Sequence, residues 1–322
     1  MEVRESFITE EAKIRFGRIG VLMGGFSSER DISLRSGTAV YESLKKQQFD
    51  VVAIDIQDSD REKIKQILKK NQINTAFIAL HGIFGEDGQI QSILEEMGIS
   101  YTGSGVQASR NALDKVQAKK IFTRYGLPTP EWVTHYKQDY QNQKPLFVPF
   151  SLPWIVKPSA NGSSIGVSLV EEPEQVKEAL EKAFFFDSCV IVEQFIKGRE
   201  MTIGIINNRP LCVIEVVPKN RWFDFEAKYQ KGLTEYIIPA VLDESLAQTL
   251  QDAALAAHRI LGCRGFSRVD LMLDKNNKFF ILEVNTIPGL TSTSLLPKAA
   301  AVAGISFDQL CLQLLETIYE KG

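Results

Sequence analysis

The sequence predicts an α/β protein whose N-terminal part is built on a parallel sheet, and three observations lead to this class. The first third alternates short apolar runs with helical patterns, which is typical of βαβ units. The stretch Gly-Leu-Pro-Thr-Pro at 126–130 interrupts this pattern and indicates a domain boundary. The last third contains two alternating runs joined by a turn, which predicts a β-hairpin. A chain of 322 residues has room for two or three domains.

The first predicted strand is the apolar run 19–23, which ends in two glycines. A helix is expected from about residue 29 to residue 44, with Ser28 as its N-cap and Asp31 at capping-box spacing. Strands separated by helices predict right-handed crossovers and a parallel sheet. The glycines are followed by Phe-Ser-Ser-Glu and do not form the GxGxxG pattern, so an NAD-binding domain is not favoured.

The remaining elements follow from the same patterns. The predicted strands lie at 51–56, 75–80, 154–157, 166–170 and 190–193, and the predicted helices lie at 61–70, 113–125, 173–184, 244–261 and 306–319.

Composition limits the possible partners and the compartment. The net charge of −3 and the pI of about 5.8 give no general basic field, so neither nucleic acid nor an anionic membrane is expected as a partner. The four cysteines are scattered without a CxxC pair, which predicts reduced thiols in a cytoplasmic protein. No apolar run is long enough to span a bilayer. Residues 1–17 are rich in charge and are expected to form an N-terminal arm, not a signal peptide.

The most informative segment is the predicted hairpin SRVDLMLDKNNKFFILEVNTIPG in the last third. With the tip of its turn at 276–277, Asp270 faces Glu283, and Arg268 faces Asn285. Because side chains alternate between the two faces of a strand, all four are expected on one face.

The two opposed carboxylates of this hairpin repel each other, and a divalent cation with oxygen ligands would offset the repulsion. Asp270, Glu283 and Asn285 offer hard oxygen ligands, which indicates Mg²⁺ or Mn²⁺ bridging phosphates and not zinc. The alternative is a solvated polar face on which Arg268 neutralises the acids.

Two further segments can bind parts of a nucleotide. The Gly/Ser-rich loop in KPSANGSSIG offers backbone N–H groups to an anion, and Lys157 adds a positive charge. A flexible hairpin is the alternative for this loop. In VIVEQFIKGRE, an apolar strand runs into Glu193, and Glu200 could accept from ribose hydroxyls. The alternative there is an ordinary surface strand end.

These segments lie in a longer series of motifs that runs through nearly the whole chain. They are GGFSSERDISLRSG (24–37), ALHGIFGEDGQIQ (79–91), YTGSGVQAS (101–109), LDKVQAKK (113–120), IVKPSANGSSIGVS (155–168), VEQFIKGREMT (192–202), FDFEAKY (223–229), SRVDLML (267–273) and LEVNTIPGLTSTSLL (282–296). In content and order they resemble the D-alanine–D-alanine ligases, which are members of the ATP-grasp superfamily.

The resemblance implies a parallel-sheet N-terminal domain followed by a two-part ATP-grasp fold. The implied division is an arm at 1–17, a substrate-binding domain at 18–115, a central ATP-grasp domain at 116–200 and a C-terminal catalytic domain at 201–322. The implied reaction joins two D-alanines at the expense of ATP through an acyl phosphate, for peptidoglycan synthesis. The implied assembly is a homodimer, and a D-alanine–D-lactate or D-alanine–D-serine ligase is the alternative function.

The resemblance also implies the nucleotide site. Lys115 and Lys157 hold the phosphates, Glu193 binds the adenine and Glu200 binds the ribose. Lys228, on a loop that closes over the phosphates, completes the set.

The same resemblance places two Mg²⁺ (or Mn²⁺) ions on Asp270, Glu283 and Asn285, in agreement with the hairpin argument. Arg268 and the backbone N–H of Gly289 stabilise the oxyanion that forms during attack on the acyl phosphate.

Both D-alanine sites are implied by the resemblance. Glu29 meets the ammonium group of the first D-alanine, with His81 nearby, although a lone histidine after a strand is often a structural residue. Ser163 and Tyr229 link to Glu29 and close the site against water. The carboxylate of the second D-alanine meets Ser294 and the N–H of Leu295.

The loop that carries Tyr229 also bears on acceptor choice. Relatives that form the D-lactate ester often have histidine at this position, so Tyr229 favours D-alanine. Phe223 and Phe225 stand where some relatives have tyrosine, which makes a polar role for them doubtful.

Overall fold

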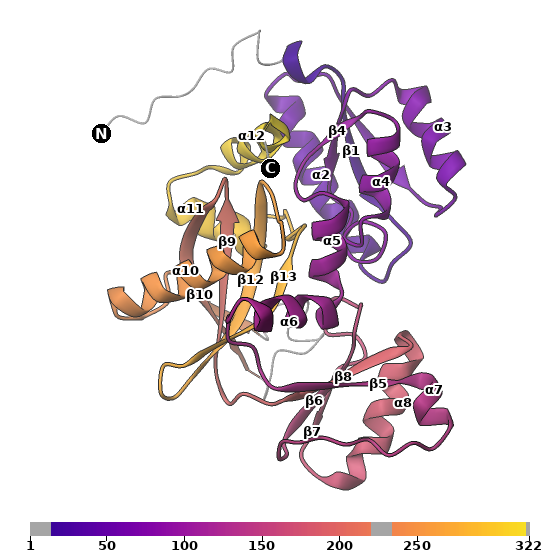
Figure 1. The fold of residues 1–322 in the computed structure, drawn as a ribbon. Coiled ribbons are helices and arrows are strands. Elements are labelled where there is room, and N and C mark those ends of the chain that lie inside the picture. Colours follow the sequence, from indigo (N-terminus) through magenta and orange to yellow (C-terminus); the bar gives the residue numbers. More distant parts are fainter. Residues whose placement is uncertain (1–13, 220–233, 320–322) are drawn as a thin grey trace.

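The computed structural model describes residues 14–219 and 234–319, and this part of the chain contains three β-sheets (Figure 1). One sheet belongs to the N-terminal third, a second to the middle of the chain, and a third to the C-terminal part. The predicted α/β class with a parallel N-terminal sheet is confirmed.

The N-terminal sheet has the order β2-β1-β3-β4, and all its strands are parallel. Val21, Leu22, Phe77 and Ile78 are fully buried, as expected for strands covered by helices on both faces. Its elements are β1 (Ile19–Gly24), α2 (Arg30–Lys46), β2 (Val51–Ile56), α3 (Arg61–Asn71), β3 (Thr75–Ile78), α4 (Gln89–Glu96), β4 (Ser100–Tyr101) and α5 (Val106–Leu113).

The start of α2 differs from the prediction. Ser28 is not the N-cap, and Asp31 does not complete a capping box. Glu29 is the N-cap residue and makes no side-chain capping bond. Its backbone N–H donates to Ser27 Oγ at 3.2 Å, while its carboxylate accepts from Ser163, far along the chain. A tertiary contact has therefore taken the side chain that local capping would otherwise use.

The helix predicted over 113–125 is in fact the second of two helices. α5 ends at Leu113, and α6 (Lys115–Arg124) begins two residues later. Asp114 caps the start of α6 by accepting from the backbone N–H groups of Val116 and Gln117. The aspartate between two helical patterns was the sequence signal for this break.

The central sheet is antiparallel and has the order β5-β8-β6-β7. Its apolar face, which includes Val156, Val190 and Val192, packs with Leu180 and Phe184 of α8. Its elements are β5 (Trp132–Tyr136), α7 (Lys137–Gln141), β6 (Trp154–Pro158), β7 (Ser168–Val170), the 3₁₀ helix η1 (Pro173–Gln175), α8 (Val176–Phe186) and β8 (Cys189–Gln194).

The C-terminal sheet has the order β11-β10-β9-β12-β13. Met201, Ile203 and Ile205 on one face pack with α10, whereas Gly204 on the other face lies against Leu296 of α11. The elements are β9 (Gly198–Ile206), β10 (Arg209–Pro218), β11 (Thr234–Ile237), α10 (Glu244–Ile260), β12 (Phe266–Asp274), β13 (Phe279–Asn285), α11 (Leu295–Val302), α12 (Phe307–Glu316) and the 3₁₀ helix η2 (Thr317–Tyr319). The domain division at residues 115 and 200 stays a proposal, and β9 runs across the second boundary.

The register of the β12–β13 hairpin confirms the predicted pairs. Asp270 pairs with Glu283, and Arg268 pairs with Asn285. Nearer the turn, Leu273 pairs with Phe279, which is one residue out of step with the predicted register. An irregularity between Asp270 and Leu271 absorbs this residue and restores the predicted pairs at the functional end.

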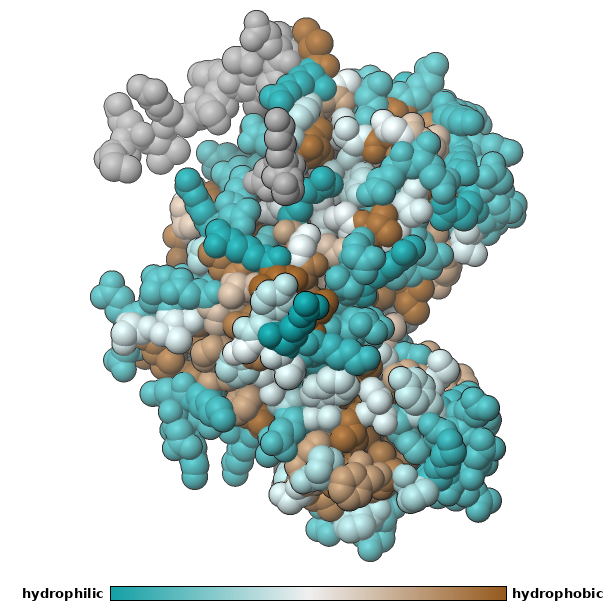
Figure 2. Space-filling model, in the orientation of Figure 1, coloured by the Kyte–Doolittle hydropathy of each residue, from teal (hydrophilic) through white to brown (hydrophobic). Residues whose placement is uncertain are grey.

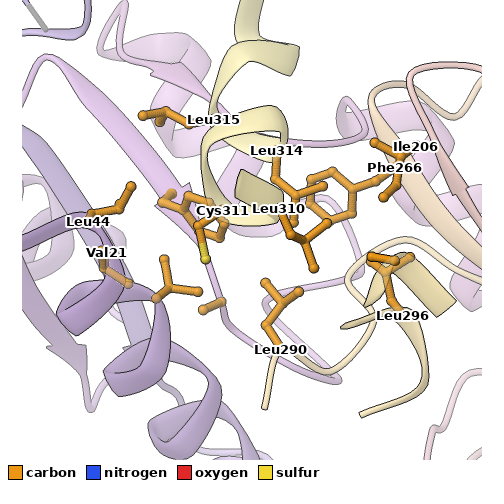
Figure 3. Packing of buried hydrophobic residues seen from close by; sticks show 14 of the residues in the cluster. Val21, Leu44, Ile206, Phe266, Leu290, Leu296, Leu310, Cys311, Leu314 and Leu315 are labelled. Atoms are coloured by element: carbon orange, nitrogen blue, oxygen red, sulfur yellow. The ribbon is translucent and has the colours of Figure 1, made fainter. Parts of the chain in front are cut away.

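Helix α12 joins the two ends of the chain in one apolar core. Leu310, Cys311 and Leu314 lie between Leu44 of the N-terminal domain and Phe266 of the C-terminal sheet (Figure 3). This packing fixes the N-terminal domain against the C-terminal sheet. One face of that sheet carries Arg268, Asp270, Glu283 and Asn285 and is called the Asp270 face below.

Hydrophilic residues cover most of the face shown in Figure 2. Within the described ranges, no single helix is long and apolar enough to cross a membrane. Helix α11 and the segment α12–η2 are together long and apolar enough for a membrane span. However, they are bent by 106° relative to each other, and both contribute buried residues to the core.

Candidate active site

A cavity of about 800 Å³ lies between the central and C-terminal sheets. The central domain lines it with Lys157 and Glu193, and the C-terminal sheet lines it with Glu200, Asp270 and Glu283. The segment 194–199, which connects the two sheets, forms another part of its wall. Residues predicted for nucleotide and metal binding therefore meet at one cavity.

Three side chains form a buried charged cluster on the central side. Lys157 on β6 places its Nζ 3.1 Å and 3.0 Å from the two carboxylate oxygens of Glu193 on β8. Lys119 of α6 approaches the same carboxylate at 2.7 Å. Burial alone would raise the pKa of Glu193, but the charges of Lys119 and Lys157 outweigh it and hold this pKa below its ordinary value.

Lys115, the first residue of α6, connects the Gly/Ser loop to the hairpin. Its Nζ donates to the backbone carbonyl of Asn161 at 2.7 Å and lies 3.4 Å from Glu283 Oε2. The cap of α6 reinforces this connection, because Ser159 Oγ donates to Asp114 Oδ1 at 2.9 Å. The loop is therefore held beside a cation that faces the cavity.

The Asp270 carboxylate is the centre of the polar face on β12 and β13. It accepts from Arg268 at 2.9 Å and 2.6 Å, from Thr202 Oγ1 at 2.5 Å and from Asn285 Nδ2 at 3.0 Å. The neutralising contact considered for Arg268 is thus present, and Lys115 lies beside the other acid, Glu283.

The donor set on this face fits a hard divalent cation. Asp270, Glu283 and Asn285 provide carboxylate and amide oxygens on adjacent strands next to a cavity that can hold phosphates. The described residues contain no group of three His, Cys, Asp or Glu placed for a metal. The predicted set has two acids and one amide, so the remaining ligands would come from phosphate and water. The roles of these three residues stay predictions.

A second, smaller cavity of about 30 Å³ adjoins the first and shares Lys115, Gly162 and Glu283 with it. Glu29 is on its wall and accepts a short hydrogen bond from Ser163 Oγ. Ser163 has a φ of +54°, a conformation that residues other than glycine rarely adopt. A Cβ added at Gly162 would lie 2.9 Å from Glu29 Oε2, so the Glu29 carboxylate would have to shift from its present place.

His81 follows β3 and is buried, with both ring nitrogens bound by the protein. Its Nδ1 donates to the carbonyl of Ile287 at 2.9 Å, and its Nε2 accepts from Ser36 Oγ at 2.9 Å. Ser36 Oγ in turn accepts from the N–H of Leu290 at 3.1 Å. His81 therefore holds the segment that carries Gly289 against α2. A direct contact of His81 with substrate stays a prediction.

Ser294 and Leu295 lie at the beginning of α11, a few residues after Gly289 in the chain. Ser294 is the N-cap residue but makes no side-chain capping bond, and its Oγ instead accepts from the N–H of Thr291 at 3.1 Å. A Cβ added at Gly289 would lie 2.8 Å from Ser294 Oγ. The uncapped N-terminus of a helix can bind a carboxylate through its backbone N–H groups.

Comparisons with known proteins agree with this arrangement. The D-ala D-ala ligase N-terminus model matches residues 18–64 and 56–104, and the D-ala D-ala ligase C-terminus model matches residues 121–316. A D-alanine–D-alanine ligase of Trichlorobacter lovleyi is 48% identical over 298 residues, which cover 92% of this chain and 93% of that protein. The chain belongs to the D-alanine–D-alanine ligase family.

Solved structures extend the likeness to the whole fold. The D-alanine–D-alanine ligase from Bacillus anthracis, crystallised with ATP, has a TM-score of 0.80 at 34% identity and covers 94% of this chain and 97% of its own. The VanG D-Ala:D-Ser ligase from Enterococcus faecalis has a TM-score of 0.82 at 30% identity and covers 94% of this chain and 99% of its own. Ligases with different acceptors therefore share this fold.

Some residues expected from the family resemblance lie outside the described ranges. These are Lys228 and Tyr229, together with Phe223 and Phe225. Their predicted roles are neither supported nor contradicted by the geometry of this ligase.

The structure adds two residues that the sequence analysis of this ligase did not single out. Lys119 lies one helical turn after Lys115, and this i,i+4 spacing was the available signal. Glu86 lines the smaller cavity, with its Oε1 3.7 Å from His81 Nδ1. Burial raises the pKa of Glu86, His81 opposes this shift, and the nearby charge of Glu29 adds to it.

Proposed function

We propose that this ligase joins two D-alanines in an ATP-dependent reaction through an acyl phosphate. The observation that carries the proposal is that the two cavities share Lys115, Gly162 and Glu283 in their walls. The Lys157–Glu193 pair lines the larger cavity, and Glu29 lines the smaller one. A nucleotide bound in the larger cavity and an amino acid bound in the smaller one would have their reacting groups next to the Asp270 face.

The nucleotide end of the site is assigned first. Lys115 and Lys157 bind the phosphates, Glu193 accepts from the adenine amino group, and Glu200 accepts from the ribose. Asp270, Glu283 and Asn285 hold two Mg²⁺ or Mn²⁺ ions, which neutralise and orient the phosphate oxygens when bound. Lys228, which lies outside the described residues, adds a further cation for the phosphates.

The reaction has two steps with balanced atoms. The carboxylate oxygen of the first D-alanine attacks the γ-phosphorus of ATP, and the bond to the ADP oxygen breaks. The deprotonated amine of the second D-alanine then attacks the carbonyl carbon of the acyl phosphate. Arg268 and the Gly289 N–H stabilise the oxyanion, and as the peptide bond forms, inorganic phosphate leaves with the proton that the amine nitrogen loses.

The amino-acid end uses groups from the N-terminal domain and from α11. Glu29 binds the ammonium group of the first D-alanine, and Ser163 and Tyr229 hold Glu29 and exclude water. His81 lies beside this group and fixes the Gly289 segment. Ser294 and the Leu295 N–H bind the carboxylate of the second D-alanine at the N-terminus of α11.

The finer properties are inferred from the family and from Tyr229. Because Tyr229 supplies no cation for the carboxylate of D-lactate, we infer that D-alanine is preferred over D-lactate as the acceptor. The preference over D-serine is inferred from the family alone. We also infer that the protein works in the cytoplasm as a homodimer and supplies the dipeptide for peptidoglycan.

The test is an acceptor panel with the purified protein, ATP and Mg²⁺. ADP release is measured with D-alanine, L-alanine, D-serine and D-lactate, each as the sole added amino or hydroxy acid and each in competition with D-alanine. We expect release with D-alanine, and D-alanyl-D-alanine as the main product of every mixture. Release only when D-serine or D-lactate is added would contradict the acceptor assignment, and no release with any acceptor would contradict the ligase proposal.

A further inference from the structure

Lys119 is a fully buried lysine on α6, with no exposed surface. Its Nζ lies 2.7 Å from Glu193 Oε2, donates to Thr129 Oγ1 at 2.7 Å and lies 3.4 Å from the carbonyl of Pro130. A charge removed from water in this way is strongly unfavourable unless it is paired, and here the carboxylate of Glu193 pairs with it.

Lys119 is not part of the cavity wall, whereas Glu193 and Lys157 are. It therefore has no direct route to a nucleotide, and any effect on binding must pass through Glu193. The arrangement places two ammonium groups on one buried carboxylate, so this cluster has an excess of positive charge next to the cavity.

Lys119 is also held by residues 128–130, the segment through which the chain enters the central domain. Thr129 Oγ1 donates to the carbonyl of Ile281 on β13 at 2.9 Å, and the Ile281 N–H donates to the carbonyl of Pro128 at 2.8 Å. The Lys119 ammonium group thus contacts both β8 of the central sheet and a segment hydrogen-bonded to the C-terminal sheet. Its position, and with it the position of Glu193, is set by both walls of the cavity.

We propose that Lys119 is a positioning residue for nucleotide binding: it keeps Glu193 paired, so that Lys157 is free to bind a phosphate. The inference rests on the proposed nucleotide site. When Lys157 turns to a phosphate, Glu193 loses one of its two cations, and Lys119 keeps the carboxylate from becoming a buried unpaired charge. Without Lys119, Glu193 would hold Lys157, and phosphate and carboxylate would compete for one ammonium group.

The test is a double-mutant cycle on the full chain, with MgADP as the ligand and calorimetry as the measurement. The proteins are the wild type, Lys119→Met, Glu193→Gln and the double variant. We expect Lys119→Met to weaken MgADP binding about tenfold in the wild-type background and less than about threefold in the Glu193→Gln background. The same factor in both backgrounds, or less than about threefold in the wild type, overturns the proposal, because the proposal requires the effect of Lys119 on MgADP binding to pass through the charge of Glu193.

A pH profile gives a second readout that remains available if Lys119→Met does not fold. Burial lowers the pKa of Lys119 to about 8, although Glu193 on β8 opposes the shift; the other charged groups facing it are Lys157 on β6 and Lys115 on its own helix. From about pH 7 to about pH 9, Lys119 loses its proton, and wild-type affinity for MgADP should fall about fivefold or more. Lys119→Arg keeps its charge in this range, so its affinity should stay within about twofold.

An equal fall in MgADP affinity with pH in the wild type and in Lys119→Arg overturns the proposal. The two possible failures are distinguishable. A wild-type protein that binds no MgADP contradicts the proposed nucleotide site, whereas a wild-type protein that binds MgADP but gives an additive cycle contradicts only the role of Lys119.

Discussion

The two walls of the large cavity carry charged clusters of different kinds. On the central wall, the side chains of Lys119, Lys157 and Glu193 are only 0%, 10% and 3% exposed, and two cations share one acid. On the opposite wall, the side chains of Arg268 and Glu283 are 19% and 24% exposed. There, Arg268 lies beside Asp270, and Lys115 lies beside Glu283.

This difference shows how one cavity can combine an ion pair that is kept, Lys119 with Glu193, with ion pairs whose members exchange partners when a ligand binds. Removing one partner from a buried pair leaves an uncompensated charge, so in the central cluster Glu193 is suited to keep Lys119 while Lys157 binds a ligand. In each pair of the Asp270 face, one member is partly exposed, whereas its partner (Asp270 or Lys115) is only 10% exposed, so water can compensate an exchange of partners better here than at Lys119. The Asp270 face is therefore suited to give up its protein cations when metal and phosphate arrive.

A large effect is expected from removing one acid of the wall that carries the Asp270 face. If Glu283 holds a cation, Glu283→Gln should raise the Mg²⁺ concentration for half-maximal ADP release about tenfold or more. Because Lys115 already lies beside Glu283, the metal-free variant should unfold within about 3 °C of the metal-free wild type. Titration of activity with Mg²⁺ and thermal unfolding in chelator measure the two quantities, and an unchanged Mg²⁺ requirement would speak against this ligand.

A smaller effect is expected at the amino-acid pocket, which adjoins both walls. Gly162→Ala would place a Cβ 2.9 Å from Glu29 Oε2 and displace the carboxylate proposed to bind the first D-alanine. The KM for D-alanine at the first site should rise about fivefold to tenfold, while the Mg²⁺ requirement stays unchanged.

Gly105→Ala is the matched control for this prediction. A Cβ at Gly105 would lie 3.6 Å from its nearest neighbour, Tyr101 Oη, so no side chain has to move. Its KM for D-alanine should equal that of the wild type. A Gly162→Ala variant with normal KM would show that the Glu29 carboxylate is not needed in its present place.

The polar face of the hairpin could be predicted from sequence because alternation and turn chemistry both act locally. The pairing of Asp270 with Glu283 was predicted correctly, yet the turn itself is one residue out of step. The irregularity that compensates lies next to Ile281, whose N–H donates to the carbonyl of Pro128 at 2.8 Å, and no local pattern of polarity reveals such a tertiary contact.

The buried cluster was only half predictable. Lys157 and Glu193 stand out because charged residues within apolar strands need a partner. Lys119 is marked only by its i,i+4 spacing from Lys115, because a lysine on a helix normally lies in solvent and its burial beside Glu193 of β8 is a tertiary feature. Likewise, Glu29 could be assigned to the site by resemblance, but its contact with the distant Ser163 is tertiary and has no local sequence signal.

The smallest expected effect is a change in the free energy of unfolding at the start of α2, where a predicted local cap is compared with an observed tertiary contact. Ser28 was predicted as the N-cap, but Glu29 occupies that position. Ser28→Ala should therefore change the free energy of unfolding by less than about 0.5 kcal/mol, below the typical value of about 1 kcal/mol for loss of an N-cap. Ser27→Ala, which removes the hydroxyl bonded to the Glu29 N–H and the His81 carbonyl, should be the more destabilised of the two in urea unfolding. The reverse order would restore Ser28 as the cap.

The central claim is that the two walls have different roles, phosphate binding at Lys157 and transition-state stabilisation at Arg268. It is tested most directly by measuring kcat and MgADP affinity for Arg268→Ala and Lys157→Met. Arg268 is proposed to act in the transition state, so its variant should lose about a hundredfold or more in kcat while MgADP affinity stays within about threefold. Lys157 is proposed to bind phosphate, so its variant should bind MgADP about tenfold more weakly. An Arg268→Ala enzyme with normal kcat and only a raised KM, or two variants that change the same quantity alike, would contradict the account.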